Sequence, residues 1–157
     1  MVFQHVELQH QNQVDAAASN IETIRGYCGY LLTGFSKFFA LPHNVNKYGV
    51  VFTSDESNLA SRISSPYGEA RGRLVIQIVD GTVGGRYVFE KGVVSSEGGD
   101  IWVPIWAIRI LRNGNVLLGD EGNIEIEVAD PGHFSNAISA PAKSLLYCIA
   151  STPVFPA

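Results

Sequence analysis

An apolar stripe in the first quarter of the chain places the strongest constraint on the fold. Between Val14 and Phe38, apolar residues recur at alternating spacings of three and four, the period of an α-helix with one buried side. The stripe consists of Val14, Ala17, Ile21, Ile24, Cys28, Leu31, Phe35 and Phe38. The spacing predicts a long amphipathic helix that ends near Leu41, because a residue before proline is driven out of the helical region.

Three glycines lie inside this predicted helix. Gly26, Gly29 and Gly34 would each cost about 1 kcal/mol relative to alanine in a helix interior. That cost has to be offset by tight packing, by a break near Gly26, or by the close approach of a neighbouring chain. A membrane span is not predicted, because the run is shorter than the roughly 20 apolar residues a span needs and contains Lys37.

The remainder of the chain has the pattern of β-structure. Turn residues separate short apolar or alternating segments, as at Asp80-Gly81, Asn113-Gly114 and residues 90–92 and 119–122. The predicted strands are 48–53, 74–79, 86–94, 101–111, 115–118, 123–128 and 144–150, with 2–8 as a short strand or docking arm and 54–68 as a loop. Asn113-Gly114 predicts a type I′ turn, so residues 101–128 are expected to form an antiparallel meander.

Consecutive strands without intervening helices predict a mainly β fold. We expect an antiparallel β-sandwich or barrel with an N-terminal amphipathic helix. Residues 1–157 read as a single domain, in which residues 1–41 form the arm and helix and residues 42–157 the β-domain. The choice between sandwich and barrel stays open, because strand order and closure are not encoded in periodicity.

The segment 101–111 is apolar on both of its predicted faces. Strict alternation places Ile101, Val103, Ile105 and Ala107 on one face and Trp102, Pro104, Trp106, Ile108 and Ile110 on the other. The second face must therefore be covered by the N-terminal helix, by another chain or by a ligand. Pro104 indicates an edge or a bulge, and an edge strand with two apolar faces aggregates unless it is capped. Self-assembly is the simplest cap.

Composition narrows the classes of partner. Charged residues make up only 17% of the chain and the net charge is -4, so a nucleic-acid partner is not expected; only Arg71 and Arg73 cluster along the sequence. The first residues lack the features of a secretory signal, which makes the cytoplasm the default compartment. Cys28 and Cys148 are expected to be small buried residues, although whether they pair stays open.

The sequence contains no strong catalytic or metal-binding signature. There is no phosphate-binding loop and no nucleophile elbow, so whether the protein is an enzyme stays uncertain, with the balance towards no. His5 and Glu7 share one face of the predicted first strand, whereas His10 lies on the other, and this spacing does not make a metal site. No cofactor is expected.

The leading hypothesis is a non-enzymatic, homo-oligomeric structural or interaction protein, such as a capsid, sheath or inclusion subunit. Its predicted interface combines the helix stripe with the tryptophan face of the strand at 101–111. The interface residues are Ile21, Ile24, Cys28, Leu31, Phe35, Phe38, Trp102, Trp106, Ile108 and Ile110.

Two alternatives remain. The helix could enter a membrane surface, and an N-terminal amphipathic helix on a β-sandwich resembles the organisation of the actinoporin pore-formers; Leu41-Pro42-His43 is the one local match, and the chain is not assigned to that family. Alternatively, the protein binds a glycan or small ligand on a tryptophan platform. The platform would consist of Tyr87, Asp100, Trp102 and Trp106. The partner and the subunit count stay open.

Overall fold

The structure is a computed structural model that describes residues 7–119, 125–128 and 137–155. Its elements, in chain order, are α1 (Leu8–Ala40), α2 (Pro42–Tyr48), β1 (Val51–Ser54), β2 (Ser61–Ser65), β3 (Gly68–Val79), β4 (Thr82–Val94), β5 (Asp100–Leu111), β6 (Asn115–Leu118), β7 (Glu125–Glu127) and α4 (Ser139–Ser151). The strands form one antiparallel sheet in which each strand pairs with the next along the chain, in the order β1 to β7.

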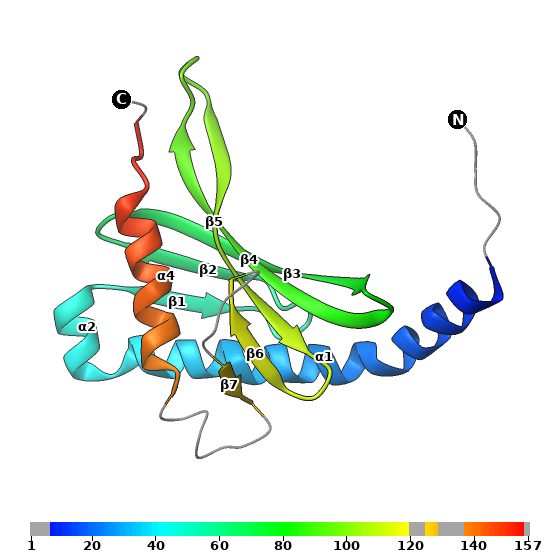
Figure 1. The fold of residues 1–157 in the computed structure, drawn as a ribbon. Coiled ribbons are helices and arrows are strands. Elements are labelled where there is room, and N and C mark those ends of the chain that lie inside the picture. The colour runs from blue at the N-terminus through cyan, green and yellow to red at the C-terminus, as the bar shows by residue number, and fades with distance from the viewer. Residues whose placement is uncertain (1–6, 120–124, 129–136, 156–157) are drawn as a thin grey trace.

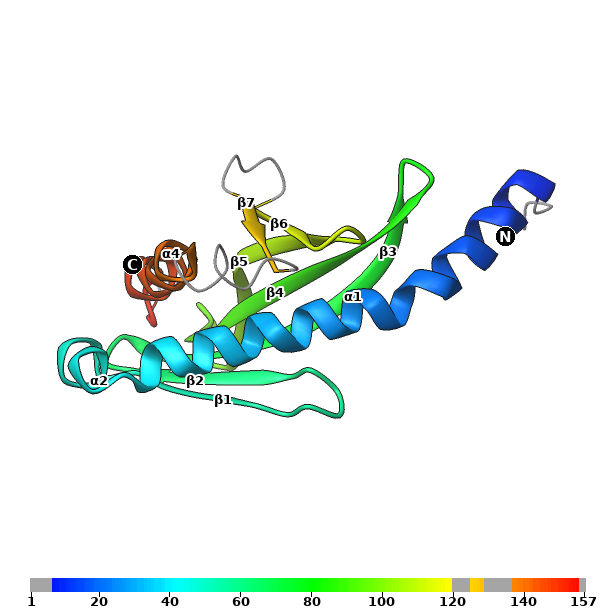
Figure 2. The same cartoon turned by 90° about the horizontal axis from the view of Figure 1, so that it is seen from below.

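The sheet curls around α1, and α4 packs beside α1 on the same side (Figures 1 and 2). We call the side that faces the two helices the inner face and the opposite side the outer face. Within the described residues, all seven strands belong to this one sheet, and helices take the place where a sandwich would have its second sheet. The antiparallel architecture and the N-terminal helix are confirmed, but helix and strand contribute about 40% and 39%, so the fold is only partly "mainly β" and a sandwich is not observed.

Helix α1 follows the predicted stripe. Ile24, Cys28, Leu31 and Phe35 are completely buried against the inner face. The helix begins earlier than predicted, at Leu8, and continues past Gly26 without a break.

The glycines of α1 do not mark a break or a tight contact where the structure reports their surroundings. No atom lies within 4 Å of the point where a side chain on Gly26 would begin, and the corresponding point on Gly29 lies 3.8 Å from Leu59 Cδ2, an ordinary contact. The packing of the stripe residues therefore offsets the cost of these two glycines.

The C-terminal segment 144–150, predicted to be a strand, is part of helix α4, so that prediction was wrong. Ala142, Leu145, Leu146 and Ile149 recur at helical spacing and are buried. Tyr147, between them, is 71% exposed. A run that is apolar at both strand and helix spacing cannot be assigned from periodicity alone, and here tertiary packing selected the helix.

Three turn and loop predictions also need correction. Residues 90–92 lie inside β4, and the predicted loop 54–68 contains β2. The type I′ turn occurs at Asp80-Gly81, where both residues have positive φ (53° and 77°), and it joins β3 directly to β4. At Asn113-Gly114 only the glycine has positive φ, in a three-residue loop. The predicted meander of β5, β6 and β7 is confirmed.

The predicted first strand, 2–8, lies largely outside the described residues. Its last residue, Leu8, is the first residue of α1 rather than part of a strand. His10, considered for a metal site, lies in α1, and His5 lies outside the described part of the chain.

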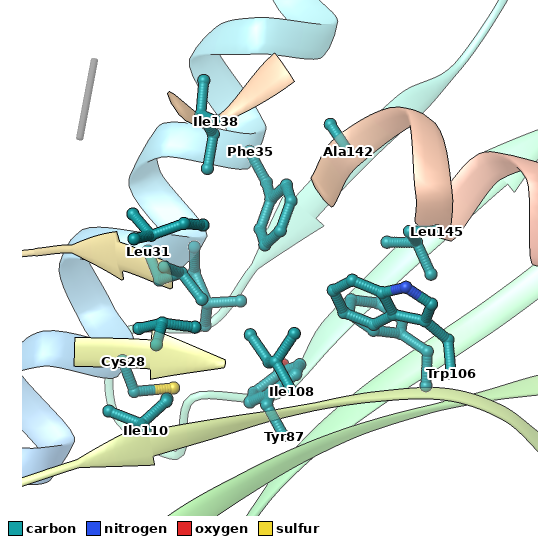
Figure 3. Close-up of a cluster of buried hydrophobic side chains, with 14 of the residues drawn as sticks. Cys28, Leu31, Phe35, Tyr87, Trp106, Ile108, Ile110, Ile138, Ala142 and Leu145 are labelled. Carbon is teal, nitrogen blue, oxygen red and sulfur yellow. The ribbon is translucent and has the colours of Figure 1, made fainter. Parts of the chain in front are cut away.

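An aromatic cluster joins α1 to the middle of the sheet. The Phe35 ring lies 6.1 Å from both the Phe52 ring and the Trp106 ring, and the Phe89 ring lies 5.8 Å from Trp106. Figure 3 shows how side chains from α1, β4, β5 and α4 converge here. The Tyr87 hydroxyl is the polar centre of this core: it donates to the Leu59 carbonyl at 2.7 Å and shares a hydrogen bond with Ser61 Oγ.

The first turns of α1 extend beyond the sheet. Both views show the helix continuing past the β3–β4 hairpin (Figures 1 and 2). Every residue from Glu7 to Asn12 is exposed, and Ala17 is the first buried residue of the helix. We call Leu8 to Ala16 the projecting turns.

Candidate functional site on the outer face of the sheet

A β-bulge separates the two tryptophans on which the ligand and interface predictions depended. Phe89 pairs with Trp106, but the next residue of β4, Glu90, pairs with Pro104, so Ile105 is an extra residue in β5. The bulge reverses the side-chain alternation at this point. Trp106 therefore points into the core, whereas Trp102 lies on the outer face, and the prediction that they share a face was wrong.

The proposed tryptophan platform is not assembled. Tyr87 is completely buried, and Trp106 is 7% exposed and donates its indole N–H to Ser144 Oγ at 3.2 Å. Trp102 is half-buried, and Asp100 is exposed at the start of β5. Of the four residues, only these two are accessible at the surface.

Most of the predicted interface is interior to the chain itself. Helices α1 and α4 cover the inner, apolar face of β5. The N-terminal helix was one of the three covers expected for this face, beside another chain and a ligand. The residues with 0% or 1% exposure are Ile24, Cys28, Leu31, Phe35, Ile108 and Ile110. Ile21, Phe38 and Trp102 are half-buried. Burial raises the pKa of the Cys28 thiol to about 12, and both Cys28 and Cys148 are free thiols.

The outer face gathers arginines that are scattered in the sequence. The strand register places Arg62 of β2 opposite Arg71 of β3, and Arg86 of β4 opposite Arg109 of β5. Arg73 lies two residues along β3 from Arg71, on the same face. Five of the chain's eleven basic residues therefore share one face. Arg62 and Arg71 both lie over the Trp102 ring, with guanidinium carbons 5.8 and 4.3 Å from its centre.

Part of this face is hollowed into an open cleft of about 560 Å³, which we call the arginine cleft. Its lining includes Asp55, Ser61, Arg62, Arg71, Arg73 and Glu90. Three guanidinium groups thus face two carboxylates.

Arg71 is held in position within the cleft. Its guanidinium carbon lies 4.3 Å from the centre of the Trp102 ring, and its Nε lies 3.5 Å from Glu90 Oε1. The Trp102 ring in turn lies over Gly92, where a side chain would begin only 3.4 Å from the indole. Arg73 Nε is 3.8 Å from the same Glu90 oxygen, and its side chain is 70% exposed. Glu90 is thus shared by two arginines.

The rim of the cleft carries a second acidic residue. Asp55 accepts hydrogen bonds from the backbone N–H and the hydroxyl of Ser57, and these bonds lower the pKa of its carboxyl group. The cleft thus has three basic side chains and two acidic ones, an excess of basic residues. Pre-positioned guanidinium groups recognise carboxylate or phosphate oxygens, so the arrangement is suited to an acidic partner.

Sequence reasoning missed this site because its arginines come from four strands. The available signal was that Arg62, Arg71, Arg73, Arg86 and Arg109 all occupy outward positions once the hairpin pairs are aligned, which a search along the sequence does not detect. Among the described residues no cluster of potential metal ligands is found, and none of the described helices has the length and hydropathy of a membrane span. Comparison with known proteins gave no match: no family model fits the sequence, and no curated protein or solved structure is significantly similar to it.

Proposed function

We propose that the protein is a non-enzymatic structural subunit that assembles with further copies of itself. The observation that carries the proposal is the projection of α1 beyond a core that is otherwise complete. From Ala17 onwards the helix stripe is buried or half-buried within the chain, so the assembly contacts are expected on the projecting turns and on the outer face of the sheet.

The projecting turns lack the local features that stabilise a solitary helix end. No side chain caps the helix start, and no acidic residue lies in the first turn. One contact of these turns is that of Gln13, whose Nε2 lies 3.2 Å from the point where a side chain on Gly81 would begin. Leu8 and Val14 of the same turns are 72% and 57% exposed. A neighbouring copy packed against these turns would bury Leu8 and Val14.

This proposal accounts for the burial pattern better than release of α1 to a membrane. Release would uncover the inner face of the sheet and expose Phe89, Ile108 and Ile110 to water, at a cost of roughly 1.5–3 kcal/mol for each side chain. Assembly through the projecting turns leaves these residues in place. A capsid, sheath or inclusion subunit is the class of protein that the proposal favours.

Light scattering after size exclusion tests the proposal at two protein concentrations. We expect a mass several times 17.0 kDa for the full chain. Deleting residues 1–16 removes the projecting turns but stops before Ala17, and it should lower the mass while leaving the circular dichroism of the sheet. Deleting residues 1–6 is the control, because it retains α1 and should assemble. A full-length chain that remains at 17.0 kDa at both concentrations contradicts the proposal.

A further inference from the structure

We propose that the acidic first half of α1 of one copy docks into the arginine cleft of the next copy. This inference rests on the proposed self-assembly and names its contact. In this arrangement, the cleft binds the acidic side of a neighbouring copy's helix.

The first half of α1 carries charge of one sign. Asp15 and Glu22 are acidic, and no lysine or arginine precedes Arg25, whose Nε lies 3.9 Å from Glu22 Oε1. The Glu22 side chain is 89% exposed, so this pair leaves it accessible to a partner. Asp15 and Glu22 are seven residues apart, which places them on the same side of the helix. Both are exposed, and the helix turns its opposite side, with Ala17 and Ile24, towards the sheet.

The spacing of the two carboxylates fits the spread of the arginines. Residues seven apart on a helix are separated by about 10 Å along its axis. Arg71 and Arg73 are about 7 Å apart along β3, and Arg62 lies on the next strand, about 5 Å to the side. Flexible arginine side chains cover the remaining distance, so Asp15 and Glu22 can both find guanidinium partners.

The cleft cannot be filled by the helix of its own chain. Helix α1 packs on the inner face of the sheet (Figure 2). The cleft is lined by Arg62, Arg71 and Arg73, which lie on the outer face. A helix that reaches the cleft therefore belongs to another copy. The two contact surfaces differ, so copies add head to tail and form either a ring or an open chain.

Charge favours a second copy over nucleic acid as the occupant. The whole chain has a net charge of -4, although five arginines lie on the outer face. The remainder of the molecule is therefore strongly acidic and repels a polyanion. Another copy can instead bring its acidic helix to the arginines of the outer face, where the opposite charges attract.

A charge-exchange experiment tests the contact. One variant combines Asp15→Lys with Glu22→Lys, and the other combines Arg62→Glu with Arg73→Glu; all four side chains are exposed, so folding should be retained. Circular dichroism verifies the fold. Light scattering should give 17.0 kDa for each variant alone, and an equimolar mixture should regain the wild-type mass because both contacts are again complementary. Lys143→Glu, on the exposed side of α4, is the control and should assemble normally.

The other outcomes separate the two proposals. If the wild type assembles and both variants assemble equally well, the docking contact is wrong while self-assembly stands. If the wild type is a monomer, self-assembly itself is wrong and the docking contact falls with it. If a single-stranded oligothymidylate binds the wild type, but not the Arg62→Glu/Arg73→Glu variant, the cleft serves nucleic acid and the docking contact is overturned.

Discussion

Gly72 of β3 is one of two buried positions in the sheet at which the surrounding atoms restrict the side chain. A side chain there would begin 2.5 Å from Ser61 Oγ and 2.5 Å from Tyr87 Cε1, inside the hydrogen-bonded centre of the core. Neither neighbour can move without breaking the bonds that Tyr87 makes to Ser61 and to the Leu59 carbonyl. A side chain at this position would therefore strain the core.

We predict that Gly72→Ala lowers the free energy of unfolding by about 1–3 kcal/mol, the usual cost of overpacking a core. Gly84→Ala is the matched control, because its added carbon would lie 3.6 Å from the nearest atom, the Ile110 carbonyl oxygen. Urea unfolding of both variants measures the difference. Equal stability of the two variants would show that the Tyr87 centre is less rigid than the structure implies.

The second position is Lys91, a lysine with 1% exposure on the inner face of β4. Its Nζ donates to the carbonyl oxygens of Ile149 and Thr152, at the end of α4. The ammonium group thereby satisfies carbonyls that a helix C-terminus leaves without partners, and it ties α4 to the sheet. Burial lowers the pKa of Lys91 below its usual 10.5.

This pKa shift predicts a specific pH dependence. Between the lowered pKa and 10.5, the unfolded chain holds a proton on Lys91 that the folded chain has released, so the free energy of unfolding rises with pH. Relative to Lys91→Met, the wild type should gain at most about 1.4 kcal/mol per pH unit across that window. Urea unfolding of both proteins from neutral pH to about pH 10 measures it. If the free energy of unfolding changed with pH in the same way in both proteins, a lowered pKa of Lys91 would be contradicted.

At the scale of elements, α1 is one uninterrupted helix despite its glycines. Since nothing lies within 4 Å of an added carbon at Gly26, alanine there should gain helix propensity without a clash. We predict that Gly26→Ala raises the free energy of unfolding by about 0.5–1 kcal/mol. Thermal unfolding by circular dichroism checks this, with Gly29→Ala as a second site in ordinary contact with Leu59. A loss of stability at Gly26 would indicate a break in the helix there.

A helix or strand could be predicted where its apolar residues followed a single spacing, either that of a helix or that of a strand. The stripe of α1 and the hairpins of the β5–β7 meander were both recognised from spacing and turn residues. Helix α4 was missed because its run of apolar residues satisfies two periods. The bulge at Ile105 was missed because Pro104 indicated an irregularity without giving its position, and that one residue moves Trp102 and Trp106 to opposite faces.

The candidate site was less predictable than the fold. Cross-strand neighbours such as Arg62 and Arg71, or Arg86 and Arg109, are adjacent only after the register is known. The predicted interface was drawn from apolar residues, and the chain buries most of those by itself. The arginines of the outer face are a further feature available to a partner, which the pattern of apolar residues does not reveal.

At the scale of the whole molecule, two regions of opposite charge lie on opposite sides of one sheet. The acidic half of α1 belongs to the inner layer and extends past its end, whereas the arginines occupy the outer face. A molecule of this kind attracts copies of itself head to tail. Because the contact depends on exposed charges, salt should weaken it: the Debye length falls from about 10 Å at 0.1 M to about 3 Å at 1 M.

The solution mass as a function of salt tests this account most directly. Light scattering should give a mass several times 17.0 kDa at low ionic strength, increasing with protein concentration, and about 17.0 kDa near 1 M salt. Circular dichroism should be the same at both ends of the series, since the core does not depend on these charges. A mass of 17.0 kDa at low salt and high protein concentration would contradict the account.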